Sequence, residues 1–147
     1  MSAKDELFRS FPVIVTQAVM WGEMDSFDHV NNVVYFRYFE NGRIAYIDRL
    51  RWQNKPVGPI LASTQAKFIL PLTYPDTIHV GTRLLGEIGA DRFTIEHQIV
   101  SEAQDAIVTV GQGVIVGYDY DKKAKAMLPD DLKKRMRALE ASVNAQG

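Results

Sequence analysis

The chain has 147 residues, a formal net charge of −1 and no cysteine. This length suits a single domain, 1–147, that can bury a core without disulfide bonds. The missing cysteine excludes thiolate zinc sites and a cysteine nucleophile, and the nearly balanced charge gives no global attraction to nucleic acid or an anionic membrane. The sequence shows neither a secretory signal nor a run long enough to span a membrane. We therefore expect a cytoplasmic enzyme or binding protein.

The first part of the chain predicts a strand followed by a long helix. Residues 1–11 are expected to form a short leader, with a helical turn as an option. Residues 13–21 carry apolar side chains on both faces, which predicts a strand covered on both sides. Residues 32–50 repeat apolar side chains at helical spacing almost all round, which is typical of a buried helix.

The second part of the chain predicts an antiparallel sheet and a terminal helix. Four further strands are predicted at 60–70, 77–89, 92–101 and 106–118, and the last three are joined by short links that are typical of hairpins. Residues 129–145 predict a helix that begins with proline and packs through a narrow apolar stripe.

Together these elements predict the α+β class, with an antiparallel sheet wrapped around a long central helix and a short C-terminal helix. A single five-stranded sheet covers only part of a helix that is apolar all round. We therefore expect a second subunit to cover the rest.

The most informative segment joins the first strand to the long helix, where residues 25–32 read Asp-Ser-Phe-Asp-His-Val-Asn-Asn. A carboxylate at Asp25 can act as a general base or a nucleophile, or it can simply cap a turn. Asn31 or Asn32 can cap the helix. The free N–H groups at Asn32 and Val33 can polarise a carbonyl with the help of the helix dipole. The segment therefore predicts an active site at a helix N-terminus.

This motif and the order of elements resemble the hotdog-fold acyl-CoA thioesterases of the 4-hydroxybenzoyl-CoA thioesterase-like group. The residues that carry the resemblance are 25–32, then Tyr35, then Phe-Glu-Asn-Gly-Arg at 39–43. One position departs from the pattern, because Asp28 stands where many relatives carry glycine. The loop is therefore expected either to bend differently or to bring a second carboxylate near the site.

The resemblance implies homodimers or homotetramers with acyl-CoA bound between two subunits. It implies that Asp25 is the catalytic carboxylate and that the backbone N–H near Asn32 acts on the thioester oxygen. Coenzyme A enters as part of the substrate, and no metal or other cofactor is expected. Thr64 is a candidate for positioning the attacking water from the partner subunit, but the role of an ordinary strand residue is favoured over it.

Several other side chains are candidates for the same site. His29 can exchange a proton near neutral pH, with a purely structural role as the alternative. Asn31 and Val33 are expected to contact the substrate, and Tyr35, Phe36 and Phe39 are expected to border an apolar groove for the acyl group. The lysines in the turn at 122–125 can meet the phosphates of coenzyme A or can simply be solvated.

Residues 111–117 contain three glycines but lack the Gly-x-Gly-x-x-Gly spacing of a dinucleotide site, so they predict close backbone approach instead.

The leading hypothesis is an acyl-CoA thioesterase that releases a free carboxylic acid and CoA. One alternative is a hydratase or dehydratase of acyl thioesters on the same fold, which would release no thiol. The other is a noncatalytic acyl-CoA-binding module, which would bind without turnover.

Overall fold

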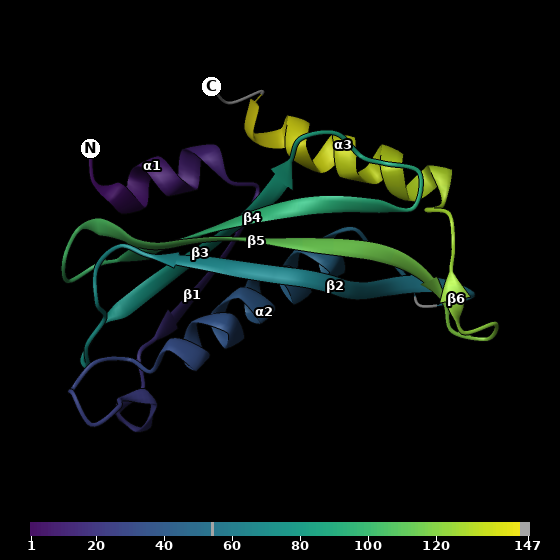
Figure 1. Cartoon of the computed structure of the whole chain (residues 1–147). Coiled ribbons are helices and arrows are strands. Elements are labelled where there is room, and N and C mark those ends of the chain that lie inside the picture. Colours follow the sequence, from purple (N-terminus) through teal and green to yellow (C-terminus); the bar gives the residue numbers. More distant parts are fainter. Residues whose placement is uncertain (54, 145–147) are drawn as a thin grey trace.

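The computed structural model describes residues 1–53 and 55–144. Its antiparallel sheet has the strand order β1-β3-β4-β5-β2, with β6 paired to β5. Helix α2 crosses one face, and helices α1 and α3 lie on the other side (Figure 1). The bounds are α1 (Ala3–Ser10), β1 (Val13–Ala18), η1 (Trp21–Glu23), α2 (Asn32–Arg49), β2 (Val57–Phe68), β3 (Thr77–Leu85), β4 (Arg92–Ser101), β5 (Ala106–Asp119), β6 (Ala124–Lys125) and α3 (Asp130–Asn144).

This arrangement confirms the α+β class and the predicted order of helices and strands. The first strand is shorter than predicted, because the 3-10 turn η1 interrupts it after Ala18. Strand β2 begins earlier than predicted, at Val57, and contains Pro59. Proline is tolerated there because β2 is an edge strand, paired only with β5 among the described residues. Within the described part of the chain, no helix has the length and apolar character needed to cross a membrane.

The leader predicted at residues 1–11 contains a helix longer than the single turn that the sequence suggested. Residues Ala3–Ser10 form helix α1, whose first turn is capped by the Ser2 hydroxyl accepting from the Asp5 N–H at 3.1 Å. Leu7 is buried and packs with Phe11 and Val100 against the sheet. A sequence of eight residues gives too short a window for periodicity to separate a helix from a leader.

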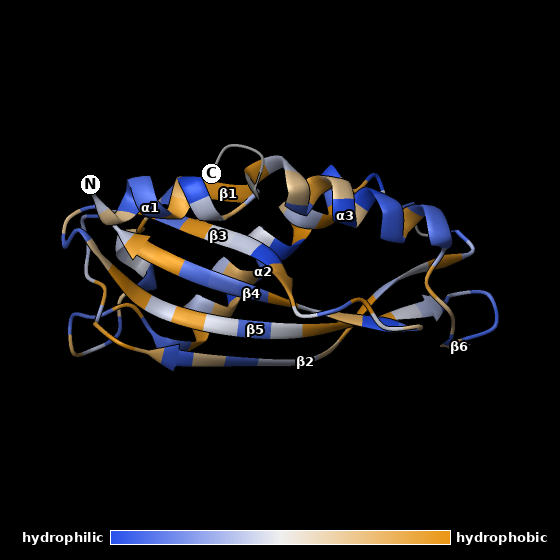
Figure 2. Ribbon diagram, turned by 90° about the horizontal axis from the view of Figure 1, so that it is seen from above, coloured by the Kyte–Doolittle hydropathy of each residue, from blue (hydrophilic) through white to orange (hydrophobic). Residues whose placement is uncertain are grey.

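Helix α2 is not buried all round in a single chain. It buries Tyr38, Phe39 and Tyr46 completely, whereas Val33 is 75% exposed and Ile44 is 51% exposed. Viewed from the side of α1 and α3, these two helices lie at the edge of the sheet formed by β1 and β3 and leave β5 and β2 uncovered (Figure 2). Val33 and Ile44 of α2, predicted to be buried, are left without cover in a single chain.

The C-terminal helix, α3, packs into the main hydrophobic core. Its Leu132, Met136 and Leu139 pack in one cluster with Tyr46 of α2 and Phe93 of β4. The helix begins at Asp130, one residue later than predicted, because the carbonyl of Pro129 accepts the first helical hydrogen bond, from Lys133. The last predicted residue, 145, lies outside the described residues.

Helix α2 comes closest to the sheet at Gly42. A Cβ added there would lie 2.5 Å from Thr82 Oγ1 and 3.4 Å from His97 Nδ1. One turn earlier, Phe39 stacks on the His97 ring, with centroids 4.8 Å apart. Burial lowers the pKa of His97 to about 3, so the imidazole is neutral in this contact. Gly111 lies below Phe39 and fits the close approach predicted for the glycines of β5.

We expect Gly42→Ala to lower the free energy of unfolding by about 1–3 kcal/mol, because the added methyl overpacks the contact with Thr82. In an exposed helix, replacing glycine with alanine would instead raise the free energy of unfolding by about 0.5–1 kcal/mol. Gly22→Ala is the matched control, since a Cβ at Gly22 meets nothing within 4 Å. Urea denaturation of both variants measures the difference. A Gly42→Ala protein as stable as the control would contradict this account of the helix position.

Candidate active site

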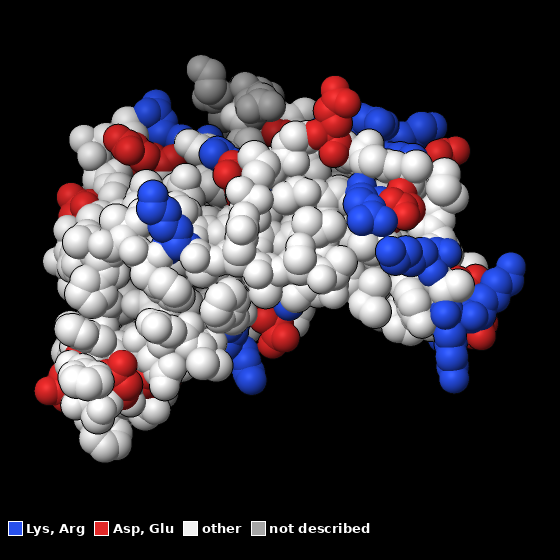
Figure 3. Space-filling model, viewed as in Figure 1, with Lys and Arg blue, Asp and Glu red and all other residues white. Residues whose placement is uncertain are grey.

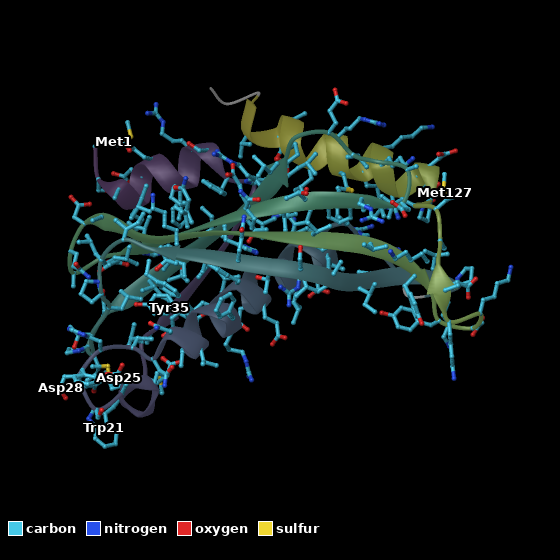
Figure 4. The ribbon with its side chains drawn as sticks, viewed as in Figure 1. Met1, Trp21, Asp25, Asp28, Tyr35 and Met127 are labelled. Atoms are coloured by element: carbon cyan, nitrogen blue, oxygen red, sulfur yellow. The ribbon has the colours of Figure 1, made fainter. Side chains whose placement is uncertain are left out.

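The loop between β1 and α2 folds into a tight turn around Asp25 (Figure 4). One carboxylate oxygen, Oδ1, accepts from the N–H of Phe27 at 2.8 Å and from the N–H of His29 at 3.3 Å. The Asp25 N–H donates to the His29 carbonyl at 2.7 Å. These bonds are those of an aspartate that closes its own turn. They hold Oδ1 and leave Oδ2 without a hydrogen bond among the described residues.

The turn is fixed to a second segment far away in the sequence. The Val30 N–H donates to the Leu72 carbonyl at 2.9 Å, and the Thr73 hydroxyl donates to the Asp28 carbonyl at 3.0 Å. The Leu72 N–H in turn donates to the Tyr35 hydroxyl at 3.2 Å. The segment that follows β2 therefore sets the position of the Asp25 turn against helix α2.

Asp28 takes the backbone conformation that explains why relatives carry glycine there. Its φ is +60°, in the left-handed region that glycine enters without steric cost and that aspartate tolerates better than most residues. The Asp28 side chain is exposed and is absent from the cavity lining. The expected second carboxylate in the cavity is therefore not supplied by Asp28 in this structure.

The start of α2 presents one free N–H to the site. Asn31 is the N-cap, and its side-chain oxygen accepts from the Val33 N–H at 3.0 Å, as the capping prediction required. The Val33 N–H is therefore already engaged and is not free to polarise a carbonyl. The Asn32 N–H has no acceptor among the described residues, so it is the donor that remains available.

A cavity of about 360 Å³ lies beside this helix start and opens to solvent. The structure brings four of the predicted site residues into its lining, namely Asp25, His29, Asn32 and Tyr35. Its other lining residues were not predicted, and most are apolar. They are Phe27, Val30, Phe68, Ile69, Leu70 and Pro71.

The unpredicted residues come from two places. Phe27 and Val30 lie within the Asp25 motif itself, so their position in that motif was the available signal. Phe68 to Pro71 follow β2, and only the fold brings them to the helix start. Phe68 packs edge-on to Tyr35, with ring centroids 4.9 Å apart. Together these rings form one apolar wall of the cavity.

Five predicted substrate-binding residues are absent from the lining of this cavity in a single chain, namely Asn31, Val33, Phe36, Phe39 and Thr64. Phe39 is fully buried against His97, so it does not border an acyl groove. Phe36 lies on the exposed side of α2, and Thr64 lies on the exposed edge strand β2.

Two tyrosines near the site are held in their neutral form. Burial raises the pKa of Tyr35, and the nearby Asp25 carboxylate adds to this shift. Burial and the hydrogen bond that its hydroxyl donates to Glu23, at 2.8 Å, raise the pKa of Tyr38. The Glu23 carboxylate also accepts from the Met20 N–H at 2.7 Å, which fixes η1 next to the Asp25 turn.

Residues 19–136 match a family model described as the thioesterase-like superfamily. The chain belongs to this superfamily. The resemblance expected from the sequence is thereby confirmed, and the expected enzyme class, a thioester hydrolase, agrees with the family.

Solved structures of related proteins share the fold. A thioesterase from Thermus thermophilus, solved with coenzyme A and Zn, is 30% identical with a TM-score of 0.79, over 90% of this chain and 97% of that chain. DHNA-CoA thioesterase from Staphylococcus aureus has a TM-score of 0.78 over 92% of this chain and 95% of that chain. At 17% identity the second likeness shows the hotdog fold alone.

Protein YsmA from Bacillus subtilis (strain 168) is 37% identical over 62 residues. This match spans 41% of this chain and 42% of that protein, so it covers less than half of the curated relative.

We expect Asp28→Val to lower the free energy of unfolding by about 1–2 kcal/mol, because a β-branched side chain is strained at φ +60°. Asp28→Gly is the matched control and should be at least as stable as the natural protein, since glycine fits this conformation. Thermal unfolding of the two variants provides the comparison. Equal stability of valine and glycine here would show that the left-handed conformation does not constrain the loop.

Proposed function

We propose that this protein is an acyl-CoA thioesterase that hydrolyses its substrate to a free carboxylic acid and CoA. The main observation behind the proposal is that Asp25 and Asn32 line the same cavity. The Asp25 carboxylate therefore lies near the Asn32 N–H at the start of α2, which has no acceptor among the described residues. Family membership supports the same reaction class. Apolar side chains fill most of the remaining wall and suit an acyl group.

Each polar group has a distinct part in the proposed reaction. Asp25 removes a proton from water while the water oxygen attacks the thioester carbon, or its Oδ2 attacks directly to give an anhydride that water then cleaves. The Asn32 N–H donates to the carbonyl oxygen as negative charge develops there. The C–S bond then breaks, and the CoA thiolate leaves and takes up a proton.

His29 has a secondary part in this proposal. Its backbone N–H and carbonyl both bond to Asp25 and so shape the turn. Its imidazole borders the cavity and makes no hydrogen bond within the described residues. In this position the ring can carry a proton to the leaving thiolate.

The edge strand β2 supports assembly through a second copy. It has twelve residues, is exposed on both faces from Ile60 to Gln65, and has β5 as its only partner among the described residues. Leu61 and Phe68 are exposed apolar side chains on this strand. A long exposed edge strand with unpaired backbone groups is a template for pairing with another chain. We infer a homodimer joined through β2, which can pair further into a tetramer.

The reaction is tested by following free-thiol release from short, long and aromatic acyl-CoAs. Asp25→Asn should lower kcat by about 10²–10⁴-fold while KM changes little, because the amide keeps the shape but cannot accept the proton. Asp28→Asn is the control, since it removes an exposed carboxylate outside the cavity. Unchanged turnover by Asp25→Asn would exclude Asp25 as the catalytic carboxylate.

The same assay separates the alternative functions. A hydratase or dehydratase would change the acyl chain of acyl-CoA without releasing thiol, and mass spectrometry of the products would show it. A binding module would retain acyl-CoA without any product.

We expect Leu61→Lys to dissociate the assembly, because a charged side chain on an exposed strand edge opposes pairing. Ile107→Lys is the matched control, since Leu61 and Ile107 are both 37% exposed and Ile107 lies on β5, where it lines a hollow beside α1. Light scattering coupled to size-exclusion chromatography gives the mass of each variant. Loss of the oligomer in both variants, or in neither, would argue against pairing through β2.

A further inference from the structure

The candidate active site has to stabilise negative charge without a cation close by. In the proposed hydrolysis this charge develops on the thioester oxygen. No lysine or arginine lines the cavity among the described residues. Acidic side chains gather on the lobe that carries the Asp25 loop, at the lower left of the space-filling view (Figure 3). The oxygen therefore depends on neutral hydrogen-bond donors, and the Asn32 N–H is the only backbone N–H so far assigned to it.

The Tyr35 hydroxyl is a second donor within the same cavity. Tyr35 lines the cavity, and its side chain is only 3% exposed. Its oxygen accepts from the Leu72 N–H at 3.2 Å. A tyrosine hydroxyl can also donate one hydrogen bond, and this proton has no acceptor among the described residues. Because buried hydroxyl groups normally find a partner, the proton suits an acceptor that enters the cavity with the substrate.

The helix brings this hydroxyl to the same side as the Asn32 N–H. Tyr35 follows Asn32 by three residues, and residues at this spacing are neighbours on the surface of a helix. Side chains on a helix also tilt toward its N-terminus, so the Tyr35 ring extends back toward the first turn of α2. In the view of Figure 4, Tyr35 lies between the Asp25 turn and the sheet.

The ring and its oxygen are held in place by three contacts. Phe68 packs edge-on to the ring with centroids 4.9 Å apart, and Tyr38 does so at 5.9 Å. The Leu72 N–H fixes the oxygen itself, and the Leu72 carbonyl is bonded in turn to the Val30 N–H. A donor held in this way needs little reorganisation when charge develops on its acceptor.

The Tyr35 hydroxyl also keeps its proton at neutral pH. Burial raises the pKa of Tyr35, and the Asp25 carboxylate adds to this shift. The group is therefore suited to donate a hydrogen bond rather than to lose its proton.

We propose that the Tyr35 hydroxyl is a second donor to the thioester oxygen, beside the Asn32 N–H. This inference rests on the proposed thioesterase function. As the nucleophile attacks the carbon, the C=O electron pair moves onto the oxygen, and both donors bind it more strongly. The electron pair returns when the C–S bond breaks and the thiolate leaves. Tyr35 donates a hydrogen bond throughout and transfers no proton.

The first test is Tyr35→Phe, assayed by free-thiol release from acyl-CoA. We expect kcat to fall about 10²–10³-fold with little change in KM, because the lost hydrogen bond is strongest in the transition state. Tyr46→Phe is the matched control. It removes another buried hydroxyl of α2, which donates to Glu140 at 2.8 Å and is absent from the cavity lining. Unchanged kcat in Tyr35→Phe would overturn the proposal.

The second test separates donation to the substrate from the structural bond to Leu72. Tyr35 is replaced with 3-fluorotyrosine, whose hydroxyl is more acidic and is therefore a stronger donor but a weaker acceptor. The control for the size of fluorine is 3-fluorophenylalanine in the Tyr35→Phe protein. At slightly acidic pH, we expect fluorine to raise kcat in the tyrosine protein relative to its effect in the phenylalanine protein. An equal or lower relative kcat would show a structural role only and would overturn the proposal.

These outcomes are distinct from failure of the proposed function. Absence of thiol release by the natural protein from every acyl-CoA would contradict the thioesterase assignment. Normal release that neither substitution at Tyr35 affects would contradict only the second donor.

Discussion

The close contact of α2 with the sheet is the constraint on which the rest of the structure depends. Gly42 allows the helix backbone to approach Thr82 and His97, and Phe39 stacks on the same imidazole. Because a helix is rigid over its length, fixing it at these two turns also fixes its N-terminus. The free N–H of Asn32 therefore has a defined position relative to the strands, before any loop is considered.

The Asp25 loop depends on that helix and on the segment after β2. Leu72 connects the two, since its carbonyl accepts from Val30 and its N–H donates to the Tyr35 hydroxyl. The Asp25 turn lies between these anchors. Its carboxylate is oriented by two backbone N–H groups, which a loop without such bonds would leave free to rotate. This preorganisation is what electrostatic catalysis of thioester hydrolysis requires.

The surface of the single chain leaves two features without cover. Strand β2 has one edge unpaired among the described residues, with Ile60, Leu61 and Phe68 exposed on it. Val33 and Phe36 of α2 are exposed apolar side chains as well. These features are the basis of the proposed dimer.

The sequence alone determined the order of the elements, the capping of α2 by Asn31 and the motif around Asp25, because each depends on residues close together in the chain. Periodicity and turn chemistry are local signals of this kind. The sequence did not show that residues 1–11 include a helix of the core, or that Phe39 turns away from the cavity. It also did not show that Phe68 and Leu70 complete the cavity wall. Those features were decided by the tertiary structure, because strand pairing brings together residues far apart in the chain.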